Sequence, residues 1–496
     1  MAAAQAQRPF TLDETTIAQV EAAFADGSLT CRSLVQQYLA RIDANDKRGA
    51  SLNAIIMTNP GALAAADDLD RRFRAGGPVG PLHCVPVIVK DNYETIDMPT
   101  SAGSLSLEGM NTGRDATVVR RLRDAGAVMI AKSNMAEFAF SPVETVSSIL
   151  PGYTRNPYDT RRVTAGSSGG SAAAIAANFA LVGLASDTGD SIRGPAAHQA
   201  LVGLRSTMGL VSRAGVVPLS LAADIAGVVT RTVEDTAVVL RVIGGPDPAD
   251  AVTASSRDHL SDYTAALRRD ALKGARIGVL HQAYDTPTLD AEVRDVFNGA
   301  IGELRDLGAE VIDPATIAGF DELRRSQGGG CNQFKYDLNR YLEGLGDRAP
   351  LHSLEEIVKS RRFHPSIQAR LESAQAADDV PGVSPGCKAR DEFRQRLRDA
   401  VGQLVDALQV DALIYPTWSN PPRLIGDLNT PGGDNNQLFS PSTGFPAITV
   451  PMGSTRGGTL PAGLQFFGRA WSEPTLIRLA YAYEQATRHR RPPTLR

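Results

Sequence analysis

Residues 166–195 read GSSGGSAAAIAANFALVGLASDTGDSIRGP, and this stretch decides the fold expected for the chain. It begins with a Gly/Ser loop, a composition that gives the backbone freedom and exposes its N–H groups. The pattern then predicts a helix of small residues over Ser171–Asn178 and an apolar strand over Leu181–Ser186. A turn-rich loop that contains Asp187 and Ser191 follows directly. Because ligand loops in parallel sheets lie at the carboxyl ends of strands, this second loop is a candidate functional position.

The same alternation of helix and strand extends outward in both directions. We predict further helices over residues 115–125, 233–243, 291–307 and 473–487. The further predicted strands are Val85–Val89, Ala127–Ala131, Ile277–Leu280, Leu413–Tyr415, Ala447–Val450 and Leu464–Phe467. Strands that alternate with helices favour an α/β fold with a mainly parallel sheet covered by helices on both faces.

The chain has 496 residues, more than the ~250–300 at which single hydrophobic cores stop growing, and this length favours more than one domain. Residues 315–400 carry more charge and no clear strand, which predicts a helical cap or insertion that helps to form a substrate pocket. The remaining predicted parts are an N-terminal helical segment (1–75), an α/β core (76–314) and the C-terminal part of that core (401–496).

Composition favours a soluble globular protein, with 43% hydrophobic and 21% charged residues and a net charge of −4. That charge does not fit a nucleic-acid-binding protein. The longest run of small apolar residues, 171–185, is shorter than the ~20 needed for a membrane span, and residues 1–9 do not resemble a secretory signal. The four cysteines are far apart, so we expect them to be reduced and mostly buried in a cytoplasmic protein. They are Cys31, Cys84, Cys331 and Cys387.

Lys90 follows the apolar strand predicted over Val85–Val89 and precedes Asp91 and Asn92. A lysine at a strand end commonly extends its ammonium group into solvent. If the amine is buried instead, desolvation lowers its pKa, and a neutral amine can act as a general base. Both interpretations remain open from the local sequence.

Taken together, these elements resemble the amidase signature family from about residue 12 to 488. The resemblance includes Lys90-Asp91-Asn92 and the ungapped spacing between the two serine-containing loops. Further matching segments are AKSNMAEF (131–138), RNPY (155–158), FPAITVP (445–451) and LQFFGR (464–469). The resemblance implies a single large mixed, mostly parallel sheet with helices on both faces. It also implies a serine-dependent amidase that needs neither cofactor nor metal.

In that family a Ser–Ser–Lys triad cleaves a C–N amide bond through an acyl-enzyme. Carried onto this chain, the resemblance makes Ser191 the nucleophile, Ser167 the bridging serine and Lys90 the base. The bridging serine would follow a cis Gly166–Ser167 peptide bond. No histidine is needed for this relay.

Backbone N–H groups would form the oxyanion hole, and the resemblance assigns them to Thr188, Gly189, Asp190 and Ser191. Three side chains would support the site: Ser168, Asp187 and Arg193. For Asp187 and Arg193 the alternative is an internal salt bridge with no catalytic role.

Two positions depart from the common family pattern. Asp190 stands where glycine is commonest, and its carboxylate beside the nucleophile would disfavour acidic acyl groups and favour neutral or cationic ones. The second departure is the stretch AAHQA (196–200), where many members have a small residue followed by Phe-Cys. His198 either alters the pocket wall or packs as a structural histidine.

The substrate class stays open between amides, anilides, esters and carbamates, including urethanes. Candidate pocket walls are the segment 328–336 with Cys331, the residue Trp418, which could equally belong to the core, and the loop 435–443 with Phe439. The expected partner is a small-molecule substrate, and neither nucleic acid nor membrane is expected to bind. The family resemblance also makes a homodimer possible to expect, because dimers are common in the family.

Three other interpretations compete with this one. The loop around Ser168 also fits Gly-x-Ser-x-Gly, the nucleophile elbow of α/β-hydrolases, but an elbow follows an apolar strand and residues 156–162 are polar and turn-like. Some family members are the glutaminase subunit of a tRNA-dependent amidotransferase. A binding protein on an amidase scaffold is the third interpretation.

Overall fold

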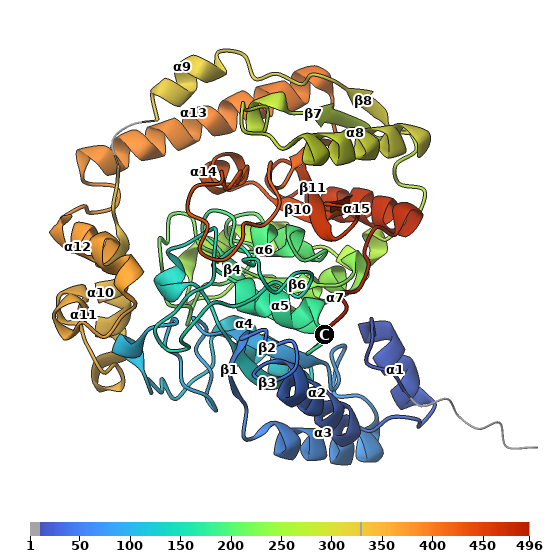
Figure 1. Cartoon of the computed structure of the whole chain (residues 1–496), viewed down its shortest axis with the longest axis vertical. Helices are drawn as coiled ribbons and strands as arrows, with labels where there is room; N and C mark the ends of the chain where they lie inside the picture. Colours follow the sequence, from blue (N-terminus) through green and yellow to red (C-terminus); the bar gives the residue numbers. More distant parts are fainter. Residues whose placement is uncertain (1–9, 328–329, 496) are drawn as a thin grey trace, which may run out of the picture.

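The computed structural model describes residues 10–327 and 330–495, and within them eleven strands form one mixed sheet. The strand order is β1-β3-β2-β4-β6-β5-β10-β11-β9-β7-β8. Figure 1 shows the sheet running from β1 and β3 at the bottom to β7 and β8 at the top. The strands are β1 (Ile55–Thr58), β2 (Pro86–Lys90), β3 (Val128–Ser133), β4 (Val182–Asp187), β5 (Val202–Arg205), β6 (Ile225–Thr230), β7 (Arg276–Val279), β8 (Glu310–Ile312), β9 (Ala412–Pro416), β10 (Ala447–Thr455) and β11 (Leu460–Phe467).

Helices surround this sheet. They are α1 (Ile17–Ala25), α2 (Cys31–Asn45), α3 (Ala62–Gly76), α4 (Thr117–Asp124), α5 (Gly169–Ala176), α6 (Arg193–Ala197), α7 (Val233–Ile243), α8 (Ala291–Asp306), α9 (Phe320–Arg325), α10 (Phe334–Leu345), α11 (Leu354–Ser360), α12 (Gln368–Ala376), α13 (Pro385–Leu408), α14 (Phe439–Thr443) and α15 (Glu473–Thr487). Short 3₁₀ helices lie at Leu105–Leu107, Glu137–Ala139, Ala251–Asp258, Tyr263–Ala266, His281–Ala283, Gly346–Arg348 and Pro365–Ile367.

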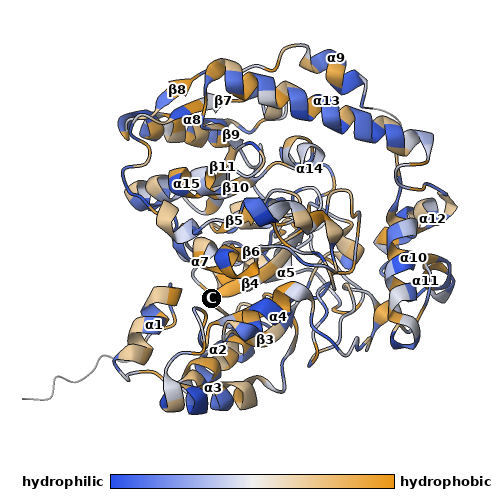
Figure 2. Ribbon diagram, turned by 180° about the vertical axis from the view of Figure 1, so that it is seen from behind, coloured by the Kyte–Doolittle hydropathy of each residue, from blue (hydrophilic) through white to orange (hydrophobic). Residues whose placement is uncertain are grey.

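The buried centre of the molecule is β4 with helix α5 packed on it. Every residue of both elements is buried, because the alanines and glycines of α5 let its backbone approach the sheet closely. At Gly183 of β4 a Cβ atom would lie 2.9 Å from Ile175 of α5, so only glycine fits without a shift. Figure 2 shows hydrophobic residues along α5 and β4 and many hydrophilic residues along the outer helix α13.

Strands β2 and β4 are parallel neighbours, with Val87 opposite Val182 and Ile88 opposite Gly183. Their β-branched and apolar residues are buried, as expected for strands covered on both faces. Since parallel neighbours end at the same edge of a sheet, Lys90 and the residues after Ser186 emerge side by side. This register places the two sequence motifs next to each other.

The single mixed sheet is confirmed, but the expectation of a mostly parallel sheet is wrong. Among the described strands, four neighbouring pairs are parallel and six are antiparallel. Two features account for this. β6 lies between β4 and β5 and runs antiparallel to both, and β10 and β11 form a hairpin. A parallel neighbour needs a long crossover connection, whereas the hairpin needs only a tight turn.

The segment 315–400 is helical and contains no strand among its described residues. Its helices α10, α11 and α12 pack through buried leucines against Phe138 and Phe140, which follow β3. In Figure 1 these three helices lie together at one side of the molecule, and α13 runs from them along its rim. Because α13 continues unbroken through residue 400, the domain boundary placed there does not coincide with a structural break. The domain division stays a prediction.

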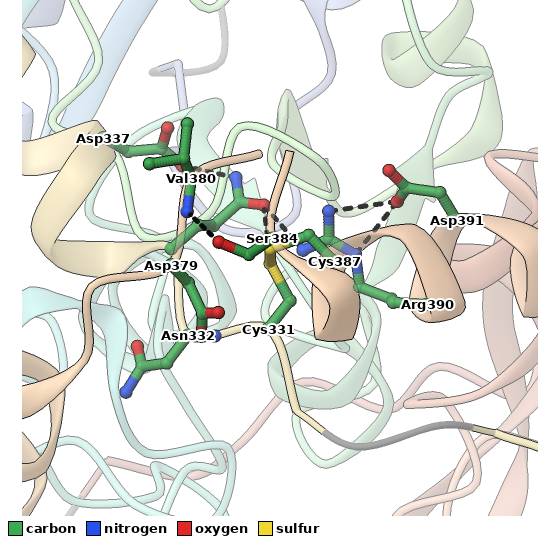
Figure 3. The surroundings of a disulfide bond; sticks show 10 residues. Cys331, Asn332, Asp337, Asp379, Val380, Ser384, Cys387, Arg390 and Asp391 are labelled. Atoms are coloured by element: carbon green, nitrogen blue, oxygen red, sulfur yellow. Dashed lines mark hydrogen bonds and ion pairs between the residues drawn. A yellow bond between two sulfur atoms is a disulfide. The ribbon is translucent and has the colours of Figure 1, made fainter. Parts of the chain in front are cut away.

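The prediction of reduced cysteines is wrong. Cys31 is bonded to Cys84 and Cys331 to Cys387, with Cα–Cα distances of 5.5 and 4.6 Å. The partners are 53 and 56 residues apart in sequence, so spacing alone gave no sign of their proximity. Figure 3 shows the second bridge, which joins the chain before α10 to the first turn of α13. Disulfides are typical of oxidising compartments, so the expectation of a cytoplasmic protein loses the support it drew from the cysteines.

Within residues 10–327 and 330–495, no helical segment combines the length and apolar character that a membrane span requires. The expectation that residues 1–9 lack a secretory signal lies outside the described residues.

We expect the Cys31→Ala/Cys84→Ala double variant to lose about 2–4 kcal/mol of unfolding free energy, because the bridge restricts the unfolded chain. Chemical denaturation, compared with a Cys331→Ala/Cys387→Ala variant, measures the loss. Thiol titration of the denatured wild type should detect no free thiol before reduction and all four cysteines afterwards. Four reactive thiols without reductant would contradict both bridges.

Candidate active site

Lys90 is the last residue of β2, and its side chain is completely buried. Its Nζ lies within hydrogen-bond distance of the hydroxyls of Ser167 at 2.7 Å, Ser168 at 2.9 Å and Ser186 at 2.8 Å. A fourth contact, at 3.4 Å, reaches the backbone carbonyl of Ser186. The local sequence left open whether this amine extends to solvent, and the structure places it inside, among oxygen atoms.

Two segments bring these oxygens to Lys90. Ser167 and Ser168 precede α5, with Ser168 as the residue before its first turn, and Ser186 lies near the end of β4. The Gly166–Ser167 peptide bond is cis, as the family resemblance implied. Glycine is required at position 166, where a Cβ atom would lie 2.4 Å from the carbonyl oxygen of Ser141. The Gly/Ser loop is therefore a tightly packed segment.

The environment of Lys90 favours the neutral amine. Burial lowers the pKa of Lys90 to about 7, although the carboxylates of Asp187, Asp224 and Asp190 act to raise it. An ordinary lysine has a pKa near ~10.4 and is almost entirely charged at neutral pH. A substantial fraction of Lys90 is therefore unprotonated near pH 7, in hydrogen-bond contact with a serine hydroxyl.

Ser191 lies in the loop between β4 and α6 and is 5% exposed. With Thr188 and Gly189 it lines a cavity of about 560 Å³. In the part of the chain that the structure describes, no protein acceptor takes a hydrogen bond from the backbone N–H groups of residues 188, 189, 190 and 191. Consecutive free N–H groups beside a hydroxyl at a cavity wall are an arrangement that can bind a developing oxyanion.

The predicted relay also requires a contact between Ser167 and Ser191. Ser167 is completely buried, and among the described residues no hydrogen bond joins it to Ser191. The structure therefore shows the Lys90–Ser167 contact directly, and leaves the second contact of the relay as a prediction.

A buried ionic cluster organises the loop of Ser191. Arg193 and Arg205 each form an ion pair with Asp187, at 3.1 and 3.0 Å, and all three side chains are fully buried. Burial acts to raise the pKa of Asp187, but the two arginines hold it below its usual value. Arg193 also donates to the carbonyl of Gly189 at 2.6 Å. The predicted salt bridge exists, and it fixes the backbone of the loop.

The same arginine ties the loop to the C-terminal part of the sheet. Arg193 donates to the side-chain oxygens of Asn436 at 3.1 Å and Gln465 of β11 at 3.2 Å. Gln465 is 272 residues away in the sequence, so the loop depends on both halves of the chain.

The carboxyl group of Asp190 points away from the cavity. A Cβ atom on Gly194 would lie 2.2 Å from Oδ2 of Asp190 and 2.8 Å from Nε1 of Trp418, so this carboxyl fills the space beside α6. Burial, with the nearby carboxyls of Asp434 and Asp187, raises the pKa of Asp190 well above its usual value. The predicted effect of an Asp190 carboxylate on acyl groups therefore has no basis in this geometry.

The predicted pocket walls are placed differently. Cys331 lines the cavity as part of its disulfide bridge. Trp418 and Phe439 are 4% and 1% exposed and do not line it; Trp418 packs on His198, and Phe439 on the aromatic rings of the sheet. Gly328, at the start of one predicted wall, lies outside the described residues.

His198 is a packed structural residue. It is buried, and its ring lies 4.6 Å from that of Trp418. Burial lowers the pKa of His198 to about 4, which leaves the ring neutral at physiological pH.

Sequence reasoning missed several residues of the site. Ser186 contacts Lys90 and also accepts from Asn92 at 2.9 Å. A signal for Ser186 existed, because it lies at the end of the strand that pairs with the strand of Lys90. Arginines 370, 390 and 394 line the cavity, and no local pattern distinguishes them from the other arginines of residues 315–400.

The described residues include no cluster of three or more His, Cys, Asp or Glu side chains arranged to hold a metal ion.

Comparison with known proteins shows which family this chain belongs to. The family described as Amidase matches residues 33–477. The chain is 33% identical to a probable amidase of Arabidopsis thaliana, over 98% of this chain and 92% of that protein. It is 35% identical to a subunit of the glutamyl-tRNA(Gln) amidotransferase of Halorhodospira halophila, over 96% and 98% of the two chains. The structure matches native peptide amidase from Stenotrophomonas maltophilia with a TM-score of 0.88 at 40% identity, covering 98% of this chain and 100% of that one. The chain therefore belongs to the amidase signature family.

Proposed function

We propose that this protein is a serine-dependent amidase that hydrolyses a C–N amide bond through an acyl-enzyme on Ser191. The observation that carries the proposal is the buried Lys90 amine, whose pKa lies at about 7 and whose Nζ is 2.7 Å from the hydroxyl of Ser167. A hydroxyl at neutral pH is a weak nucleophile and needs an adjacent base. Lys90 is such a base.

The proposed reaction moves one proton through the relay in each direction. Neutral Lys90 takes a proton from Ser167, which takes one from Ser191 as its oxygen bonds to the amide carbon. The free N–H groups of residues 188–191 then bind the oxyanion. The relay returns the proton to the amide nitrogen, the C–N bond breaks, and water hydrolyses the remaining ester. Hydrogen bonds of this kind often tighten only when substrate binds, which is consistent with two serines that are not bonded to each other among the described residues.

The names of similar proteins support a small amide as the substrate. One of these proteins is a peptide amidase and another a probable amidase. The same acyl chemistry would also cleave esters and carbamates, because the attack on the carbonyl carbon is common to all three. Selectivity then depends on the cavity walls.

A second candidate is the glutaminase role in a tRNA-dependent amidotransferase, in which the chain would release ammonia from an amide within a complex. The observation that favours it is the 35% identity to glutamyl-tRNA(Gln) amidotransferase subunits over nearly the whole chain.

We expect Ser191→Ala to lower kcat by about 10³-fold or more, because the variant lacks the hydroxyl that is proposed to take the acyl group. Mass spectrometry of wild type trapped with a slowly deacylating ester should find the acyl group on Ser191. The matched control is Ser168→Ala, which keeps the trapped adduct in place. An adduct on Ser168 would instead support the α/β-hydrolase interpretation.

We expect kcat/KM for an uncharged amide to rise about tenfold per pH unit below pH ~7 and to level off above it, because only unprotonated Lys90 is a base. A pH–rate profile measures this, with folding checked by circular dichroism at each pH. A rate that falls as pH rises through this range would show that the protonated amine is the active form, against the proposed role.

The purified chain alone should hydrolyse simple carboxamides. If the chain releases ammonia from glutamine only when amidotransferase partner subunits are added, the glutaminase role replaces the amidase proposal. Both results come from one ammonia-release assay with a panel of aryl amides, peptide amides and glutamine.

A further inference from the structure

The charged side chains among the described lining residues of the Ser191 cavity are all positive. Three arginines line it, namely Arg370, Arg390 and Arg394, and no aspartate or glutamate is among its described lining residues. The remaining polar walls are neutral hydroxyl, amide and backbone groups such as those of Ser220 and Gln437. A cavity with one sign of charge raises the local concentration of ligands of the opposite sign.

Arg394 lacks a direct ion pair among the described residues, although the carboxylate of Asp391 lies near enough to favour its charged form. In the described part of the chain its one hydrogen bond runs from Nη1 to the carbonyl of Ala222 at 3.1 Å. Burial, and then the neighbouring charge of Arg390, lowers the pKa of Arg394 to about 10. It therefore remains a cation at neutral pH, and an anion beside it would relieve the repulsion.

The other two arginines are held by neighbouring side chains, which lie within the cap for Arg390 and in the core for Arg370. Arg390 lies one helical turn before Arg394 on α13; it donates to Gln333 at 2.6 Å and pairs with Asp391 at 3.0 Å. The guanidinium of Arg370 lies 4.4 Å above the ring of Phe140, which also lines the cavity. Arginine forks bind carboxylates through two parallel hydrogen bonds when they are oriented in advance.

The disulfide fixes this wall. Cys331 lines the cavity, and its bridge to Cys387 holds the first turn of α13, one turn before Arg390 (Figure 3). Asn332 donates to Asp379 at 2.8 Å beside the same bridge. The arginines are therefore presented to the cavity by a cross-linked segment.

We propose that Arg394, with Arg390 and Arg370, forms an anion-binding subsite, and that the preferred substrates are amides bearing a carboxylate on their acyl or amine part. This rests on the proposed amidase function. It reverses the preference for neutral or cationic acyl groups that Asp190 suggested, because the Asp190 carboxyl lies outside the cavity and these arginines lie inside it.

The test compares kcat/KM for two matched pairs of aryl amides. In one pair the acyl part is a succinyl group or its methyl ester, and in the other the amine part is 4-aminobenzoate or its methyl ester. Wild type should prefer the anionic member of at least one pair. Arg394→Gln should lower that anionic-to-neutral ratio about ten- to hundredfold, as expected for the loss of a charged hydrogen bond. Arg394→Lys keeps the positive charge, so this variant should retain part of the wild-type preference for the anionic substrate.

Arg398→Gln is the matched control, because Arg398 lies one turn further on α13 and does not line this cavity. Its ratio should equal that of wild type. The subsite would be overturned if wild type showed an equal or lower kcat/KM for the anionic member of both pairs. An anionic-to-neutral ratio that stays unchanged in folded Arg394→Gln and Arg370→Gln variants would overturn it as well. If wild type hydrolyses none of the four substrates and Ser191 is not acylated, the proposed function itself fails.

Discussion

The whole site depends on one buried amine. Placing the charged form of a lysine inside a protein is costly unless the group is paired or loses its proton. Lys90 is completely buried, and its hydrogen-bond partners are hydroxyls and a carbonyl, without a carboxylate in direct contact among the described residues. Its neutral form is stabilised by that environment. β2, β4 and the segment before α5 must all meet at this point, so the chemistry of the amine constrains the centre of the fold.

A second constraint lies one residue beyond Ser186. Asp187 is a buried carboxylate that two buried arginines keep ionised. Removing one partner from such a cluster leaves an uncompensated charge, which is far more costly than never burying the pair. The cluster therefore holds the loop of Ser191 in one conformation. Because Arg193 also bonds to Gln465 of β11, the C-terminal strands help to hold that conformation.

The helices of residues 315–400 complete the cavity. Their own apolar cluster includes Phe138 and Phe140, which lie at and just after the end of the segment AKSNMAEF. The disulfide between Cys331 and Cys387 then holds α13 against the chain that enters α10. Core and cap thus share the cavity: the core supplies hydroxyls and free N–H groups, and the cap supplies the arginines.

The sequence by itself determined the parts of the site that follow from local pattern and family resemblance. Lys90 at a strand end, the loop around Ser167 and the strand that leads to Ser191 are all where periodicity and motif spacing predicted them. Helices α7 and α15 also begin and end at the predicted residues. The strands β5 and β6 were not recognised, and the proportion of parallel pairs was overestimated.

Only the tertiary structure decided which groups meet. It placed Ser186 on Lys90, turned the carboxyl of Asp190 away from the cavity, paired the four cysteines and brought the arginines of α12 and α13 to the site. Local patterns record which face of an element is apolar. They do not record distances between residues that the chain separates by tens or hundreds of positions, because those distances depend on how the elements pack.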